Sequence, residues 1–94
     1  MRGVVAVMEQ AVPVVNSLGL HARPAAQFVK VANRFKASIA VRKDETEVNG
    51  KSIMGMMMLS AECGSELRIR CDGDDAEAAM AALSALVRAG FGED

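Results

Sequence analysis

The chain has 94 residues and a formal net charge of −1, with 51% hydrophobic and 24% charged residues. These values predict one globular domain with a small core and exclude a disordered chain. The near-neutral charge gives no electrostatic basis for binding nucleic acid, and the sequence contains no stretch long enough for membrane insertion.

The first two elements predicted along the chain are a strand and a helix. A β-branched run over residues 12–15 indicates a strand, and Pro13 within it requires an edge strand or a bulge. After a turn, apolar residues recur at spacings of three and four from residue 22 to about residue 36. Because Pro24 is tolerated in a first turn, this helix is predicted to begin close to His21.

The middle of the chain predicts two short strands followed by a short helix. Residues 38–43 alternate between apolar and polar, as in a half-buried strand, and residues 46–48 form the return strand. Residues 52–59 contain four methionines and could be a strand by hydrophobicity alone. The helix propensity of Met and the N-cap preference of Ser52 favour a helix, which Gly55 weakens by up to about 1 kcal/mol.

The last two predicted elements are another strand and another helix. Residues 65–71 alternate cleanly between polar and apolar side chains. Asp74 and Glu77 form an acidic version of the capping box, so a helix is predicted to start there and to end at Gly90 as its C-cap.

The resulting order is βαββαβα. Each helix has one apolar stripe and each strand has one apolar face, so each must be buried on one side only. The economical arrangement is an α+β fold in which a four-stranded antiparallel sheet carries three helices on one face.

The segment Gly-Leu-His-Ala-Arg-Pro at residues 19–24 combines three features that suit phosphate chemistry. A histidine at a helix N-cap faces free backbone N–H groups, which attract anions together with the helix dipole. Arg23 adds a permanent positive charge with several donors, and a neutral imidazole is a competent nucleophile. Taken by themselves, these residues also allow a plainer interpretation, in which His21 is a surface or capping residue.

No metal or other cofactor is expected. The chain has a single histidine, and Cys63 and Cys71 lie outside the usual spacing of zinc ligands. Because no secretory signal accompanies them, the two cysteines are predicted to be reduced thiols of a cytoplasmic protein.

Residues 18–25 closely resemble the active-site motif of HPr, the histidine-containing phosphocarrier family of the bacterial phosphoenolpyruvate:sugar phosphotransferase system. Residues 49–55, Asn-Gly-Lys-Ser-Ile-Met-Gly, resemble the regulatory serine segment of that family and lie at the family's spacing from the first motif. The resemblance covers about residues 10–92. It implies an HPr-like open-faced sandwich as a single domain over residues 1–94, with a short N-terminal extension of about residues 1–9.

The resemblance assigns roles to residues of the first motif. His21 is implied to be phosphorylated through Nδ1, with Arg23 assisting at the phosphate and the N–H groups of Ala22 and Arg23 binding the phosphoryl oxygens. Enzyme I would supply the group from phosphoenolpyruvate, and a IIA domain would receive it. The chain would then be a monomeric reactant in a relay and not an independent enzyme.

The resemblance also assigns roles around the second motif. Ser52 is implied to be the regulatory phosphorylation site, a substrate of HPr kinase/phosphorylase, whereas its chemistry alone indicates only a helix cap. We hypothesise that phosphorylated Ser52 slows transfer from Enzyme I. Met56 is expected to face the core, and adaptable methionines suit docking to several partners. The implied docking residues are Leu20, Ile53, Met54 and Met57, for which core filling is the alternative.

Two other functions remain open from the sequence. A regulatory HPr paralogue of the nitrogen-related branch would use the same His21 chemistry without transporting sugar. A binding module of related layout, such as an RNA-binding fold, would need surface aromatics and a basic face. The chain contains no Tyr or Trp and has a net charge of −1, so no nucleic-acid partner is expected.

Overall fold

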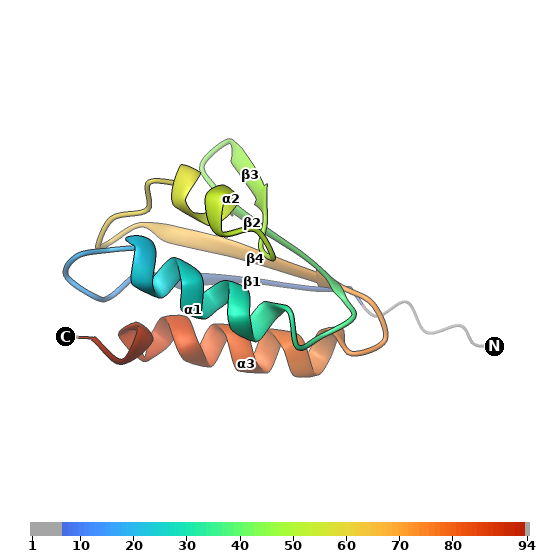
Figure 1. Cartoon of the computed structure of the whole chain (residues 1–94). Helices are drawn as coiled ribbons and strands as arrows, with labels where there is room; N and C mark the ends of the chain where they lie inside the picture. The colour runs from blue at the N-terminus through green and yellow to red at the C-terminus, as the bar shows by residue number, and fades with distance from the viewer. Residues whose placement is uncertain (1–6, 94) are drawn as a thin grey trace.

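The computed structural model describes residues 7–93 and contains one four-stranded sheet and three α-helices (Figure 1). The strands are β1 (Val7–Pro13), β2 (Ser38–Lys43), β3 (Thr46–Asn49) and β4 (Glu66–Asp72). The helices are α1 (Ala22–Ala32), α2 (Ile53–Met58) and α3 (Ala76–Arg88), and α3 is followed by the short 3₁₀ turn η1 (Gly90–Gly92).

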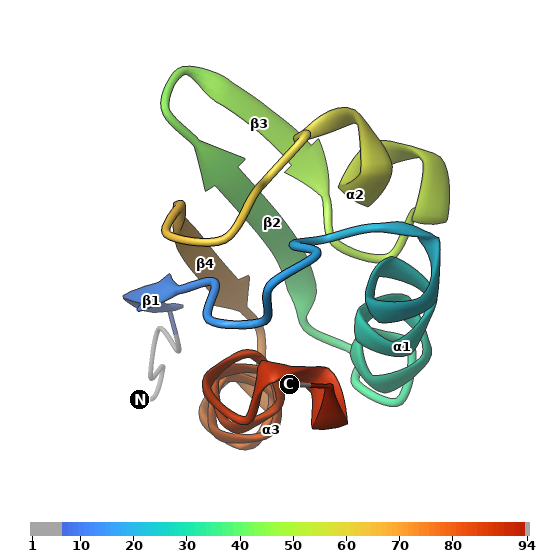
Figure 2. The ribbon, with the colours of Figure 1, turned by 90° about the vertical axis from the view of Figure 1, so that its left-hand side faces the viewer.

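All three helices cover the same face of the sheet (Figure 2). The strand order is β1-β4-β2-β3, and every neighbouring pair is antiparallel. Helix α3 packs on β1 and β4, α2 packs beside β3, and α1 contacts both other helices. The predicted α+β open-faced sandwich is therefore confirmed, including its element order.

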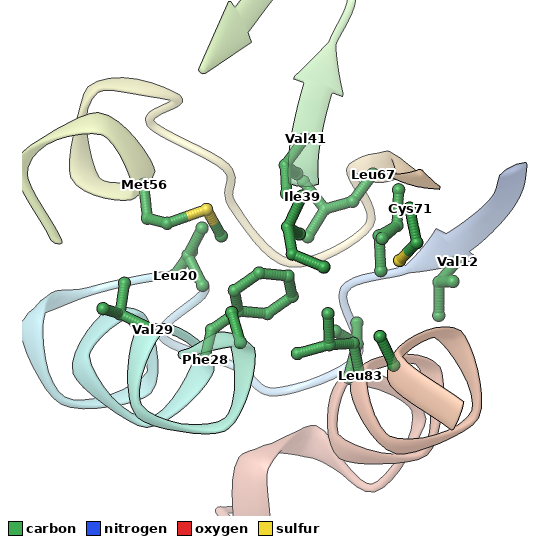
Figure 3. Close-up of a cluster of buried hydrophobic side chains, with 14 of the residues drawn as sticks. Val12, Leu20, Phe28, Val29, Ile39, Val41, Met56, Leu67, Cys71 and Leu83 are labelled. Carbon is green, nitrogen blue, oxygen red and sulfur yellow. The ribbon is translucent and has the colours of Figure 1, made fainter. Parts of the chain in front are cut away.

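The core lies between the sheet and the helices and is built almost entirely from aliphatic side chains (Figure 3). Alternate residues of β2 and β4 point inward, as their sequence pattern predicts, and they are fully or almost fully buried. Phe28 of α1 is the largest completely buried side chain. Its ring and Ile39 lie against Gly50, where an added Cβ would come within 2.6 Å of Ile39 Cγ2 and 3.2 Å of Phe28 Cε1.

The first strand is longer than predicted at its start and shorter at its end. β1 is an edge strand with Pro13 as its last residue, so Pro13 lies where a missing N–H does little harm. Val7–Glu9 pair with β4, whereas the predicted N-terminal extension included them. The rest of that extension, residues 1–6, lies outside the described residues.

The prediction that the first helix reaches about Lys36 is wrong, because α1 ends at Ala32. The Asn33 side chain donates to the Val29 carbonyl at 3.0 Å, and the next two N–H groups bond to carbonyls three residues back. These shorter bonds tighten the chain into a turn, so residues 33–36 leave the helix although their apolar spacing continues it.

The predicted capping box at the start of α3 is also wrong. The N-cap is Asp75, and its side chain makes no capping bond. Its carboxylate accepts the N–H groups of Lys36 and Ala37 at 2.8 Å each, and the Lys36 bond is the largest cause of the lowered pKa of Asp75. At the other end, Ala89 is the C-cap and the predicted cap Gly90 follows it with φ +64°, the left-handed conformation that favours glycine.

Both predicted thiols are free in the structure. Cys63 is exposed, whereas Cys71 is buried under the helices. Burial, followed by the nearby charge of Asp75, raises the pKa of the Cys71 thiol to about 11. No helix among residues 7–93 is both long and apolar enough to cross a lipid bilayer.

Candidate functional site

His21 is the N-cap of α1, as the sequence predicts. Its backbone is extended, with φ −78° and ψ −171°, and its side chain makes no capping hydrogen bond. The imidazole therefore remains available for chemistry, and 36% of the side chain is exposed to solvent.

Two backbone N–H groups at this helix start have no hydrogen-bond partner among residues 7–93. An α-helix leaves its first N–H groups without partners inside the helix. Here Pro24 has no N–H, and the Ala25 N–H already bonds to the His21 carbonyl at 3.0 Å. Ala22 and Arg23 remain, and both residues are exposed beside the histidine. A helix N-terminus with these two donors suits an anion of the size of a phosphoryl group.

Arg23 adds a guanidinium group to the same helix start. Its side chain is exposed, and among residues 7–93 no carboxylate lies within salt-bridge distance of it. An arginine that is not already paired keeps its donors for an incoming phosphate.

The loop that leads into His21 is fixed against the segment that follows α2. The Leu20 N–H donates to the Ala61 carbonyl at 2.8 Å. Gly19 has φ +70°, and a Cβ there would lie 2.5 Å from the Ala61 carbonyl oxygen. Only glycine combines this backbone conformation with so close an approach. Gly19 therefore allows the loop to pack directly against the segment that follows α2.

Sequence reasoning missed two residues of the site, Glu93 and Asn16. His21 Nε2 lies 3.0 Å from both carboxylate oxygens of Glu93. The buried Asn16 donates through Nδ2 to Glu93 Oε1 at 3.0 Å and to the Gly19 carbonyl at 2.7 Å. The His21 hydrogen bond is the largest cause of the lowered pKa of Glu93. No local pattern indicates this contact, because 72 residues separate His21 from Glu93.

Ser52 is the N-cap of α2, which confirms the structural half of its prediction. Its Oγ accepts the Gly55 N–H at 3.0 Å, and the residue is half-buried. Ser52 directly precedes Ile53 and Met54, which are exposed on α2. A role for Ser52 as a phosphorylation site stays a prediction.

The exposed side of α2 carries three of the four predicted docking residues. The exposed fractions are 45% for Ile53, 75% for Met54 and 44% for Met57, whereas Met56 is buried as predicted. The prediction that Leu20 takes part in docking is wrong, because it is only 4% exposed and belongs to the core. Leu18 and Met58, which are 75% and 69% exposed, were not among the predicted docking residues.

The comparisons with known proteins agree with this geometry. The sequence model of the family described as "PTS HPr component phosphorylation site" matches residues 8–89. The phosphocarrier protein HPr of Neisseria meningitidis serogroup A is 44% identical over 86 residues, which are 92% of this chain and 97% of that protein.

Two solved structures are similar in fold and sequence. The crystal structure of HPr-C-His from Thermoanaerobacter tengcongensis has a TM-score of 0.89 and 45% identity, covering 93% of this chain and 98% of that one. The Bacillus subtilis catabolite repression protein Crh, described as a swapped-domain dimer, has a TM-score of 0.72 and 43% identity. That match covers 86% of this chain and 93% of Crh.

Proposed function

The chain belongs to the HPr family, the phosphocarriers of the phosphotransferase system, and we propose that it accepts a phosphoryl group from Enzyme I on His21 and passes it to a IIA domain. One observation carries the proposal. The only imidazole of the chain lies at a helix N-terminus, beside the N–H groups of Ala22 and Arg23 and the Arg23 side chain, which forms no salt bridge within residues 7–93.

The proposed transfer needs little from this chain besides position and charge. The lone pair of His21 Nδ1, the ring nitrogen that Glu93 does not contact, attacks phosphorus while the bond to the donor group breaks. Phosphoryl transfer is promoted mainly by alignment and by donors that stabilise the charge on the equatorial oxygens. Ala22 and Arg23 supply such donors, and the partner protein supplies the rest of the transfer site. A nucleophilic group of the IIA domain then attacks the same phosphorus. The N–P bond breaks, and its electron pair returns to His21 Nδ1.

Incubation with phosphoenolpyruvate and catalytic Enzyme I tests this function directly. We expect intact-mass analysis to detect the gain of one phosphoryl group, and brief acid treatment to remove it, since phosphohistidine is acid-labile. No gain with Enzyme I from the same organism would overturn the proposed carrier role.

We also propose that Ser52 is a regulatory site for HPr kinase/phosphorylase. A phosphate on Ser52 would add about −1.5 to −2 charges beside the exposed apolar side of α2. A helix N-terminus stabilises negative charge, so α2 should stay folded with a phosphate on Ser52. The added charge should therefore weaken the docking of partner proteins more than it lowers the stability of the fold. We expect Ser52→Asp to slow transfer from phosphorylated Enzyme I about tenfold, or about 1.4 kcal/mol, in a rapid-quench assay.

Ser60→Asp is the matched control for this prediction. Ser60 is exposed just beyond the opposite end of α2 and has φ +50°, a conformation that Asp tolerates. The control adds a similar charge to the same protein away from the helix start. Equal transfer rates for Ser52→Asp and the unmodified chain would contradict the regulatory proposal.

A regulatory role without sugar transport is the second candidate function. The similarity to Crh, a catabolite repression protein, favours it. The same His21 chemistry would serve a paralogue of the nitrogen-related branch. Transfer from His21 to a sugar-specific IIA domain supports the transport role, whereas transfer only to a nitrogen-related IIA domain supports the regulatory one.

We propose that the chain acts as a cytoplasmic monomer. His21, Arg23 and the carboxylate of Glu93 all come from one chain, so the site needs no second copy. Crh is described as a dimer, and sedimentation of the purified protein distinguishes the two states.

A further inference from the structure

The contact between Glu93 and His21 fixes where the ring proton must lie. An ionised carboxylate is only a hydrogen-bond acceptor. Both of its oxygens lie 3.0 Å from Nε2, so this nitrogen must carry the hydrogen, because its lone pair would otherwise face two negative oxygens. In the neutral ring, Nδ1 then holds the free lone pair.

We propose that Glu93, oriented by Asn16, is a positioning residue that fixes the tautomer of His21 and balances the positive charge that its ring acquires on phosphorylation. The proposal rests on the proposed phosphocarrier function and assigns it two residues outside the active-site motif. Neither residue touches the transferred group: Glu93 acts through the ring, and Asn16 acts through Glu93.

Residues 90–93 are folded in a way that holds Glu93 in place. Phe91 is buried, with 3% exposure, although its φ of +57° is unusual for a residue other than glycine. The Glu93 N–H bonds to the Gly90 carbonyl at 2.9 Å, and Gly90 lies against Asn16. Phe91 thus anchors the turn from which the Glu93 side chain reaches His21, leaving that side chain only 15% exposed.

Asn16 joins this turn to the loop before His21. Its side chain is completely buried, and one amide group, Nδ2, donates both to Glu93 Oε1 and to the Gly19 carbonyl. Asn16 therefore fixes the position of the Glu93 carboxylate relative to the loop that precedes His21. Its Oδ1 has no hydrogen-bond partner among the described residues, so the side-chain amide forms hydrogen bonds there only through Nδ2.

The charge balance of the transfer explains why a carboxylate helps. The neutral ring uses its Nδ1 lone pair to form the N–P bond, and the donor leaves with the electron pair of the broken bond. With Nε2 still protonated, the ring then carries a positive charge, which Glu93 faces from the Nε2 side. A carboxylate that orients a histidine and stabilises its cation has this role in hydrolases. The lowered pKa of Glu93 keeps it ionised near neutrality.

Glu93→Ala and Glu93→Gln separate the two parts of the proposal. We expect Glu93→Ala to reduce the saturated transfer rate about tenfold without changing the KM for Enzyme I, because both paired side chains are partly exposed and the effect is smaller than for a buried pair. The ring ¹⁵N spectrum of unphosphorylated protein in alkaline solution should show a larger share of the Nδ1–H tautomer. Gln still accepts the Nε2 hydrogen but lacks the charge, so Glu93→Gln should keep the tautomer and lose part of the rate.

Glu45→Ala is the matched control, because Glu45 is an exposed carboxylate in the turn between β2 and β3. It should leave both the ring spectrum and the transfer rate unchanged. Asn16→Asp replaces the donor with an acceptor of similar size and should reproduce the tautomer change of Glu93→Ala.

A Glu93→Ala protein with the tautomer ratio and transfer rate of the unmodified chain would overturn the proposal. An unmodified chain that accepts no phosphoryl group would overturn the proposed function instead. The ring spectrum needs no partner protein, so in that case it would still decide whether Glu93 sets the tautomer.

Discussion

Replacement of His21 with alanine is expected to abolish phosphoryl uptake from phosphoenolpyruvate and Enzyme I while the chain stays folded. His21 is the only histidine, so no other side chain can form the acid-labile phosphoryl adduct of the proposed relay. The helix loses no side-chain cap, because the imidazole does not cap α1. Intact mass after incubation measures the uptake, and thermal unfolding followed by circular dichroism measures the fold.

Ser52→Ala is the matched control, an alanine replacement at the N-cap of the next helix. It removes the bond from the Gly55 N–H to Ser52 Oγ and should cost about 1 kcal/mol of stability. Phosphoryl uptake through Enzyme I should nevertheless remain. An acid-labile phosphoryl group on His21→Ala would contradict the assignment of His21, and so would loss of uptake in Ser52→Ala.

Most of the fold could be predicted because each element buries one face, and the period of that face is local in sequence. The alternation in residues 38–43 and 65–71 gave β2 and β4 nearly to the residue. The ambiguous methionine segment became a helix because Ser52 caps it and Met56 fills the core. In these segments local preference and tertiary packing agree.

Helix boundaries were predicted less well, because contacts between distant residues decide them. Asp74 and Glu77 have the spacing of a capping box, yet Asp75 is the N-cap and uses its carboxylate on the loop after α1, 38 residues away from Ala37. That bond fixes both the start of α3 and the path of residues 33–37. Neither segment contains a local sequence pattern that indicates the start of α3 or the path of residues 33–37.

The same distinction applies to the candidate site. The helix start, His21 and Arg23 lie within one short segment, so their chemistry could be predicted from it. Glu93 reaches the ring only through the fold, and it is one of 12 acidic residues with no pattern to single it out. The resemblance implied that Leu20 takes part in docking, but the loop turns its side chain into the core.

Replacement of Phe28 with alanine is expected to cost about 3–5 kcal/mol of unfolding free energy. The Phe28 ring is fully buried between α1 and the sheet, close to Ile39 and Gly50, so its removal leaves a cavity that these neighbours fill only in part (Figure 3). Domains of this size have about 5–15 kcal/mol in total, so the midpoint of thermal unfolding should fall by about 20 °C. Urea unfolding followed by circular dichroism measures the loss.

Phe35→Ala is the matched control, because it removes the same ring from a partly buried position just after α1. It should cost less than half as much as Phe28→Ala, since less apolar surface becomes exposed and no closed cavity forms. Equal losses at the two positions would contradict the placement of Phe28 at the centre of the core. Phe28 packs α1 against the sheet, and His21 lies at the start of α1. The stability of this core contact therefore also fixes the position at which the imidazole is presented to the partner protein in phosphoryl transfer.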